Sequence, residues 1–271
     1  MALTKEQIKE FKEREKEAED SDDFKNIADD IAEAGDKQWA KKIYKKAEKK
    51  AEDCSDFRMV ADSILEKLGD KDWAKKVFEK AEKKAKECSE FRDLANSIHE
   101  KLGDKKWTKT VYKKAVGKAE ECPEFRDLAD DIHKNLGDKD WAKKIYKIAE
   151  EKGVDSFDFH KLAESIFKNL EDKELLKEVY KKWEQKVEDR YDYRYLADSL
   201  IKNIGDKKWA KKFYKKEEDS TEKYIQINFI EFKTRMDNDE DMIVDDIVEE
   251  GRIMILRDSG DPIYRITVEI A

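Results

Sequence analysis

The chain is poor in residues that interrupt regular structure, and it has no long apolar run. Two of its 271 residues are proline and nine are glycine, so few positions would stop a helix. No stretch reaches the roughly 18 consecutive apolar residues that indicate a transmembrane helix. The first residues, MALTKEQIKEF, lack the apolar core of a secretory signal. We therefore expect a cytoplasmic protein that does not enter a membrane.

Cysteine and histidine, two common metal ligands, occur three times each. Cys54, Cys88 and Cys122 recur at one constant spacing, with no CxxC pair or histidine cluster beside them, as a metal or redox site would require. Neighbouring helices lie about 8–10 Å apart, whereas a disulfide needs Cα atoms within about 7 Å. We predict that the cysteines are small, half-buried packing residues; a metal or redox site is the less favoured alternative.

Signatures of catalysis are missing as well. The sequence contains no GxGxxG, GxxxxGK[ST], HExxH or GxSxG motif. His99 and His133 are separated by the same spacing as the cysteines, which favours a repeated structural role. Carboxylates are so frequent that no pair stands out as an acid and a base. We therefore expect no enzyme, no cofactor and no metal; an enzyme would need a clustered polar pocket, which the sequence does not reveal.

Charge is what the chain has in abundance, since 46% of its residues are charged. From Asp219 to the end there are 14 acidic and 6 basic residues, a balance of −8 that equals the net charge of the whole chain. Residues 1–218 therefore balance to zero. No overall basic footprint for nucleic acid is present, and we expect no nucleic-acid partner.

A period of about 34 residues, a length typical of helical solenoids, organises most of the chain. Aromatic or leucine side chains recur at this spacing, at Trp39, Trp73, Trp107, Trp141, Leu175 and Trp209. Each unit contains two amphipathic segments. In the second unit Phe57, Val60, Ala61, Ile64 and Leu68 form one apolar stripe before Gly69, and a second stripe begins at Trp73. The fixed period therefore predicts a solenoid of repeated helix pairs.

The unit resembles the tetratricopeptide (TPR) repeat, an antiparallel helix pair of about 34 residues. The first full unit matches the family's sequence of large, small, turn and aromatic positions with Phe24, Ile27, Ala28, Ile31, Gly35, Ala40, Tyr44 and Ala47. Later units carry one extra residue before the turn glycine, and the family's end-of-repeat proline is mostly missing. The resemblance covers about residues 5–218 and implies a mainly α, right-handed α-solenoid. Sel1-like repeats are a distant alternative, because their period usually varies more.

Different patterns flank the repeats. We predict an N-terminal capping helix within residues 1–20, started by a capping box of Thr4 and Gln7, and six TPR-like repeats over 21–218. Residues 219–271 change to β-branched and aromatic segments around a short acidic helix. We predict a small, acidic α+β module of order β-α-β-β there. It would either cap the solenoid or serve in partner binding, including self-association through its strands.

The resemblance to TPR repeats also implies where a partner binds. The first helix of each pair lines the concave face, and family positions 5 and 9 fall in five units on Arg58 and Asp62, Arg92 and Asn96, Arg126 and Asp130, His160 and Glu164, and Arg194 and Asp198. The members of each pair are four residues apart and therefore neighbours on a helix. One interpretation is a polar groove for a charged peptide or protein; the other is a self-neutralising ladder of little energetic value.

The irregular units indicate a second candidate surface. In the fifth unit Leu175 replaces Trp and Trp183 replaces a small Ala, a change that compensating packing between the two would also explain. Phe157 and Tyr191 stand where earlier units have Ser55, Ser89 and Pro123. Tyr195 likewise replaces polar residues or Met. Aromatics concentrated in one zone are typical interface anchors. We predict a partner-binding patch of Phe157, Trp183, Tyr191 and Tyr195; packing of the C-terminal module over these rings is the alternative.

Together these features predict a non-enzymatic scaffold that binds a protein or peptide through the solenoid surface. A second hypothesis is an adaptor, regulator or inhibitor whose acidic C-terminal module is the binding element, with the repeats as a spacer. Deletion of residues 219–271 separates the two, because the repeats alone would still bind under the first hypothesis.

Overall fold

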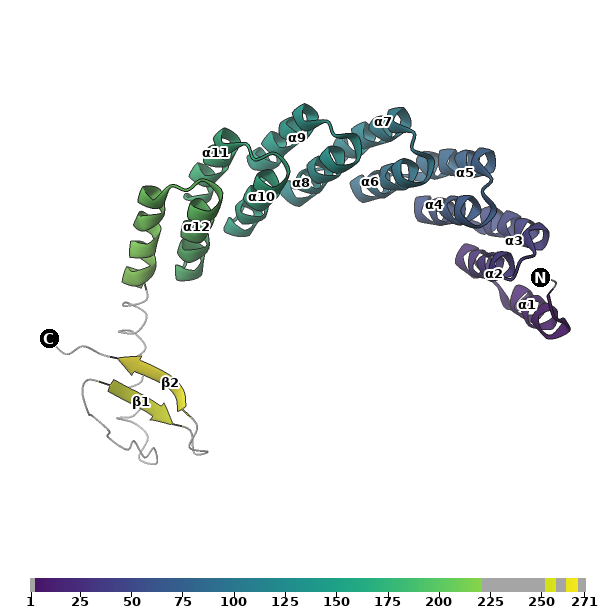
Figure 1. Cartoon of the computed structure of the whole chain (residues 1–271), viewed down its shortest axis with the longest axis horizontal. Helices are drawn as coiled ribbons and strands as arrows, with labels where there is room; N and C mark the ends of the chain where they lie inside the picture. The colour runs from purple at the N-terminus through teal and green to yellow at the C-terminus, as the bar shows by residue number, and fades with distance from the viewer. Residues whose placement is uncertain (1–2, 221–251, 257–261, 268–271) are drawn as a thin grey trace. The chain divides into compact units, whose positions relative to one another are not determined.

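The computed structural model describes residues 3–220, 252–256 and 262–267. The chain divides into two compact units, Met1–Tyr214 and Lys215–Ala271. The first contains the helical repeats, and two strands of the second are described (Figure 1).

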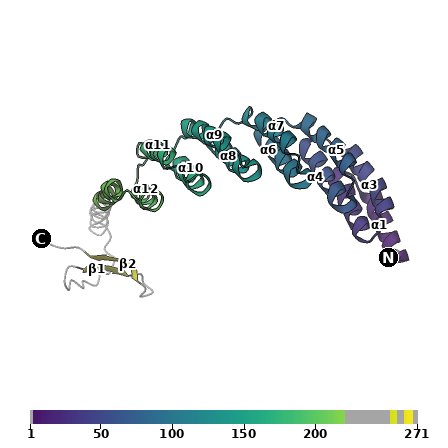
Figure 2. The same cartoon turned by 45° about the horizontal axis from the view of Figure 1, so that its top comes forward.

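The first unit is a series of antiparallel helix pairs that follow one another along an arc (Figures 1 and 2). The helix α1 (Lys5–Glu17) comes first, and the inner side of the arc carries α2 (Ser21–Glu33), α4 (Cys54–Ser63), α6 (Cys88–Ser97), α8 (Cys122–Asp131), α10 (Ser156–Asn169) and α12 (Arg190–Asn203). The outer side carries α3 (Lys37–Lys50), α5 (Lys71–Lys84), α7 (Lys105–Val116), α9 (Lys139–Lys152) and α11 (Lys173–Trp183). A further helix at residues 207–220 follows α12 in the sequence and is the second helix of the last pair. These thirteen helices of the described residues confirm the mainly α, TPR-like arrangement of repeated pairs, which we number units 1 to 6 from α2–α3 onward.

The first helix begins and packs as the sequence predicts. The Thr4 hydroxyl accepts from the Gln7 amide at 3.2 Å, and the Gln7 side chain accepts from the Thr4 amide at 3.0 Å. Phe11, the buried residue of α1, meets Trp39 of unit 1 edge to face, with ring centroids 5.9 Å apart. Through this contact α1 packs on the first repeat.

Each outer helix is capped by an aspartate, and in several units the preceding unit takes part in the cap. Asp70 accepts from the Trp73 amide at 3.2 Å and from the Lys41 ammonium of unit 1 at 2.7 Å. Hydrogen bonding to Lys41 and to that amide lowers the pKa of Asp70. Lys109 and Lys143 reach Asp138 and Asp172 in the same way. An N-cap aspartate is stabilising because it satisfies an orphan amide at the positive end of the helix, and here it also joins neighbouring units.

The extra residue of the later units is accommodated by π-helical turns. This holds in units 2, 3 and 4, where the inner helix ends in a five-residue π-helix, η1 (Ile64–Leu68), η2 (Ile98–Leu102) and η3 (Ile132–Leu136), whereas α10 and α12 of units 5 and 6 stay α-helical. Each π-helix is followed by a left-handed glycine, such as Gly69 with φ 71°, a conformation that suits glycine best. Unit 5 has Glu171 at this place with φ 53°, so a residue with a Cβ adopts the left-handed turn there.

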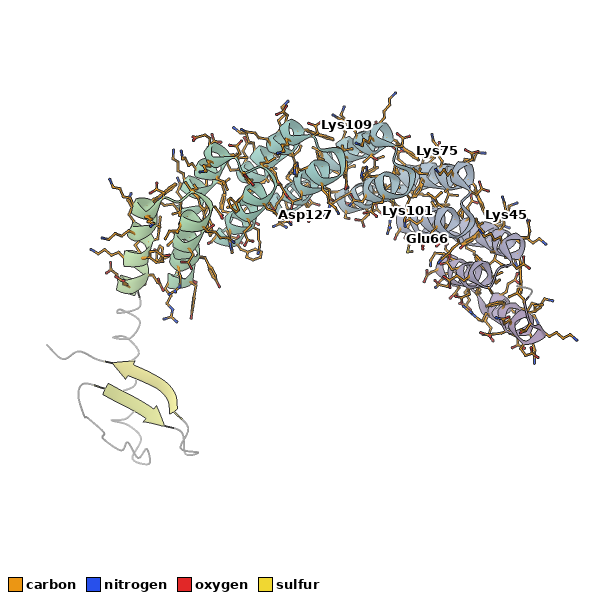
Figure 3. The ribbon with its side chains drawn as sticks, viewed as in Figure 1. Lys45, Glu66, Lys75, Lys101, Lys109 and Asp127 are labelled. Atoms are coloured by element: carbon orange, nitrogen blue, oxygen red, sulfur yellow. The ribbon has the colours of Figure 1, made fainter. Side chains whose placement is uncertain are left out.

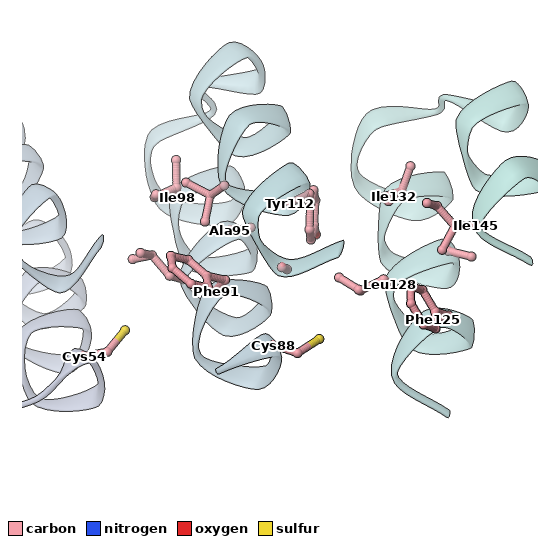
Figure 4. Close-up of a cluster of buried hydrophobic side chains, with 14 of the residues drawn as sticks. Cys54, Cys88, Phe91, Ala95, Ile98, Tyr112, Phe125, Leu128, Ile132 and Ile145 are labelled. Atoms are coloured by element: carbon pink, nitrogen blue, oxygen red, sulfur yellow. The ribbon is translucent and has the colours of Figure 1, made fainter. Parts of the chain in front are cut away.

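The core runs through all six repeats as one layer of buried side chains between inner and outer helices. Cys54, Cys88 and Cys122 belong to it as free, buried thiols, and Figure 4 shows two of them near Phe91 and Phe125. We expected them to be half-buried; they are 1–3% exposed. Burial raises their pKa, to about 12 for Cys54, 11 for Cys88 and 12 for Cys122. The packing interpretation of the cysteines therefore fits their positions.

Two strands are described in the second unit. β1 (Arg252–Leu256) and β2 (Pro262–Thr267) pair antiparallel, with Arg252 opposite Thr267 and an irregularity between Ile255 and Leu256. They fall within the segment 219–271 for which the sequence predicts the β-α-β-β module. The expected first strand and acidic helix lie outside the described residues, and the β-α-β-β order stays a prediction.

Candidate partner-binding surface

A hydrogen-bonded ladder along the inner helices involves the residues at family position 9. In unit 4 the Tyr146 hydroxyl on the outer helix donates to Asp130. From the next unit, the Ser165 hydroxyl and the Asn169 amide each donate to Asp130 at 3.0 Å. One carboxylate therefore joins two helices of its own unit to the next unit. Asp130 is a structural acceptor as well as a candidate contact residue.

The same contact recurs in units 1, 3 and 6, whereas in unit 5 the Tyr180 hydroxyl contacts the Ser199 hydroxyl of the next unit at 2.7 Å. Tyr44 donates to Asp29 in unit 1, Tyr112 to Asn96 in unit 3, and Tyr214 to Asp198 in unit 6. A tyrosine–acceptor pair that spans the two helices is thus the usual way in which this chain fixes a repeat.

Unit 2 departs from this rule, because Phe78 occupies the place of the tyrosine. Asp62 accepts from Ser97 at 3.0 Å and from Arg58 at 3.4 Å through one oxygen. Its other oxygen, Oδ1, is buried without a hydrogen-bond partner in the part of the chain that the structure describes. Burial raises the pKa of Asp62, against the opposing effects of Ser97 and Arg58.

The arginines at family position 5 are held in ion pairs. Arg92 reaches Asp131 at 2.6 Å and Asp127 at 3.0 Å, and Arg126 reaches Asp127 at 2.8 Å. The predicted pairs Arg58–Asp62, His160–Glu164 and Arg194–Asp198 have separations of 3.4, 3.5 and 4.0 Å. These contacts favour the self-neutralising interpretation for units 2 to 4, where the arginines are engaged with neighbouring carboxylates.

Exposed aromatic side chains gather on units 5 and 6. Phe157 on α10 is 64% exposed, and Tyr191 and Tyr195 on α12 are 57% and 56% exposed. We call these three residues the aromatic patch. Two cations border it, Lys161 at 5.7 Å from the Phe157 ring and Arg190 at 4.6 Å from the Tyr191 ring. Large aromatic surfaces in water are costly unless a partner covers them.

Trp183, the fourth predicted member, is fully buried and does not face solvent. Its ring stacks on His160 with centroids 5.2 Å apart, and the other side of His160 stacks on Tyr195 at 5.6 Å. The Trp183 indole donates to Ser156 at 2.8 Å, and Ser156 donates to Asp192 at 2.7 Å. Trp183 therefore supports the patch from the core and fixes the orientation of Tyr195.

His160 is the central ring of this stack. Burial lowers its pKa, with Glu164 opposing the effect, so the imidazole is neutral at pH 7 and packs as an aromatic ring. This makes His160 an element of the support rather than a charged contact at neutral pH.

Two exposed apolar residues in the same part of the chain, Val154 and Ile201, are not among the predicted site residues. Comparison of equivalent positions would have found Val154, because Glu52, Lys86, Glu120 and Glu188 occupy its place in other units. An apolar residue at a position that is charged in the other units is the sequence signal that indicates Val154 as a candidate surface residue.

Among the described residues, no group of three or more histidine, cysteine, aspartate or glutamate side chains has a geometry that could hold a metal ion. Among these residues, no helix combines the length and the apolar character that crossing a membrane requires.

Comparison with known proteins yields no named relative of this sequence. No protein-family model matches the chain, and no curated protein matches its sequence. One similar solved structure is the C-terminal part of a TPR repeat-containing protein from Cytophaga hutchinsonii. It has 18% sequence identity and a TM-score of 0.38, and the match covers 72% of this chain and 78% of that chain. The TPR-like description of the repeats therefore rests on the helix pairs of this chain.

Proposed function

We propose that the chain is a non-enzymatic interaction scaffold that captures a protein or peptide on the inner face of units 5 and 6. The aromatic patch is the observation that carries this proposal. Polar or small residues occupy most equivalent positions in earlier units, such as Ser89 for Tyr191 and Asp93 for Tyr195. Exposed tyrosines on a rigid support are suited to partner binding because they lose little conformational entropy on contact.

The support beneath the patch strengthens the proposal. Tyr195 stacks on His160 and His160 on Trp183, so the free protein already holds the ring in place. A preorganised anchor binds more tightly than a mobile one, since less order has to be created on association. The ion-paired arginines of units 2 to 4 would then form the polar surroundings of the contact.

The test is a double substitution, Tyr191→Ala with Tyr195→Ala. Partners are recovered with the full-length protein from its source cell, identified by mass spectrometry, purified, and titrated by calorimetry. We expect a loss of about 30-fold or more in affinity, as for central aromatic anchors. The matched control is Ser89→Ala with Asp93→Ala at the equivalent positions of unit 3, which should bind like the parent protein.

Circular dichroism and the thermal midpoint separate lost contacts from lost folding. Unchanged affinity of the folded double variant would refute the proposal. If deletion of residues 219–271 abolishes capture while the double variant still binds, the acidic C-terminal module is the binding element instead.

A further inference from the structure

One line of equivalent positions on the inner helices changes the sign of its charge halfway along the repeats. The six residues, two places after the last buried isoleucine or leucine of each inner helix, are Glu33, Glu66, Glu100, Lys134, Lys168 and Lys202. We call them the charge ladder. All six are exposed. Figure 3 shows Glu66 on the inner side of the arc together with Lys101 and Asp127, whereas Lys45, Lys75 and Lys109 lie on the outer side. The balance of zero over residues 1–218 hides this separation.

In the acidic half, the carboxylates are more exposed than the cations that pair with them. Lys67 bonds Glu33 at 2.6 Å, with side-chain exposures of 24% and 62%, and Lys101 lies 3.2 Å from Glu66, with 34% and 56%. Lys101 lowers the pKa of Glu66, so this carboxylate is ionised at neutral pH. Besides Glu33, the inner helix α2 carries four carboxylates and one lysine, which adds to the effect. A ligand approaching units 1 to 3 therefore meets negative charge first.

In the basic half, the three ladder lysines Lys134, Lys168 and Lys202 are exposed and form no ion pair within residues 3–220. The carboxylates of α8 do not cancel them at the surface, because Asp131 is mostly buried against Arg92 and Asp130 accepts from Tyr146 and Ser165. The helix α12 has three basic and two acidic residues. Lys168 and Lys202 lie on α10 and α12, the helices that carry the aromatic patch, so units 5 and 6 present ammonium groups that form no ion pair among the described residues on the same helices as the exposed rings.

We propose that the partner segment is bipolar: its basic residues contact the ladder over units 1 to 3, its acidic residues contact units 4 to 6, and an apolar residue near its acidic end occupies the aromatic patch. This inference rests on the proposed function and adds the chemistry of the partner. A uniformly basic segment would face three lysines, and a uniformly acidic one would face three glutamates. Like charges across an interface disfavour the wrong partner and the wrong orientation.

The required length follows from the helix spacing. Adjacent helices are about 9 Å apart, so five steps from unit 1 to unit 6 span roughly 45 Å. An extended peptide advances about 3.4 Å per residue, which makes the bound segment about 13 residues long. Such a segment is short enough to be made as a synthetic probe.

The experiment uses the full-length protein and labelled peptides of about 16 residues. The first has a lysine block, then a glutamate block with a tryptophan beside the glutamates. The matched control has the same composition with alternating charges. Fluorescence anisotropy at about 50 mM salt, where screening is modest, should show the block peptide binding about tenfold more tightly or better.

Charge reversal tests the ladder itself. The triple variant Glu33→Lys, Glu66→Lys, Glu100→Lys should lose the preference for the block peptide and bind an all-glutamate peptide more tightly. The triple variant Lys134→Glu, Lys168→Glu, Lys202→Glu should shift in the opposite direction, towards an all-lysine peptide. Reversal of all six positions should favour a block peptide whose tryptophan lies beside the lysines, because the aromatic patch stays in place.

Equal affinity for block and alternating peptides, or preferences that do not follow the reversals, would overturn the bipolar segment. So would tightest binding of the all-glutamate peptide to the parent protein, which would indicate a polyanion. Self-association that the triple variants abolish would place a second copy on this face and also overturn it. The proposed function fails separately, since it depends on the loss of the purified partner by the Tyr191 and Tyr195 double variant.

Discussion

Phe78→Tyr restores the hydrogen bond that unit 2 lacks and should stabilise the protein. Asp62 Oδ1 is buried without a hydrogen-bond partner among the described residues, and Phe78 stands where Tyr44, Tyr112 and Tyr146 donate in units 1, 3 and 4. Those tyrosines are fully buried, as Phe78 is, so the fold already accommodates a phenol at this position. The new hydroxyl would donate to Asp62.

The magnitude follows from the charge of the acceptor. A hydrogen bond to a charged group contributes about 1.5–3 kcal/mol, and burial of the hydroxyl offsets part of it. We expect a gain of about 1–2 kcal/mol at pH 7. For a repeat array of this size, about 1 kcal/mol shifts the thermal midpoint by roughly 2–4 °C, so the variant should melt about 2–8 °C higher.

The gain should depend on pH in a direction that the pKa of Asp62 sets. Burial raises this pKa in the folded parent protein, while Ser97, Arg58 and Lys101 lower it and Glu100 raises it. A raised folded pKa means that ionisation of Asp62 opposes folding as the pH rises above about 4. The added donor stabilises the ionised form, so the difference between Phe78→Tyr and the parent should widen between about pH 4 and pH 7.

Urea unfolding followed by circular dichroism at both pH values is the assay. The matched control is the same substitution in an Asp62→Asn background, which reproduces the Tyr112–Asn96 pair of unit 3. There the gain should be smaller, about 0.5–1.5 kcal/mol, and independent of pH. A loss of stability at pH 7, or an equal gain at both pH values, would refute the reasoning.

Three further substitutions test other parts of the structure by urea unfolding. Glu171→Gly removes a Cβ from a left-handed turn and should stabilise by about 0.5–1 kcal/mol; a loss would contradict the strain. Asp70→Ala removes a cap that Lys41 also bonds and should cost about 1 kcal/mol or more. Because the pKa of Asp70 is lowered on folding, its contribution is present above about pH 4 and is lost as the pH falls through the folded pKa. Asp104→Ala is the comparison, since Asp104 caps identically but bonds no lysine among the described residues, and a cost equal to that of Asp70→Ala would show that Lys41 contributes nothing. Trp183→Ala empties a fully buried site and should cost about 3–5 kcal/mol, whereas a cost under about 1 kcal/mol would place the indole outside the core.

The sequence predicts the repeats well because their pattern is local. Apolar residues spaced three and four apart define each helix, and the glycine that follows ends it. The π-helical turns were not predictable to the same degree. The extra residue before Gly69 shows that something is inserted, but an added residue can lengthen a helix, form a loop or widen one turn, and side-chain packing decides among these.

The candidate site was predicted in part. Phe157, Tyr191 and Tyr195 are exposed as expected, whereas Trp183 lies in the core. A large residue in place of Ala signals either exposure or a rearranged core, and the sequence does not reveal which space is free. The sequence pairs Asp130 with Arg126, four residues earlier on the same helix. Its tyrosine donor lies 16 residues away on the other helix, and a contact across helices is invisible to a periodicity within one helix.

The three buried cysteines are natural probes of local opening between neighbouring repeats. Cys54, Cys88 and Cys122 start three successive inner helices, and the Cys54 thiol lies 3.9 Å from the Glu90 carbonyl of the following unit. A thiol that is covered and has a raised pKa reacts with an alkylating reagent only after the joint around it opens. The labelling rate of each thiol, measured by mass spectrometry, therefore reports how often the repeat that begins at α4, α6 or α8 separates from the following repeat. No change to the sequence is needed.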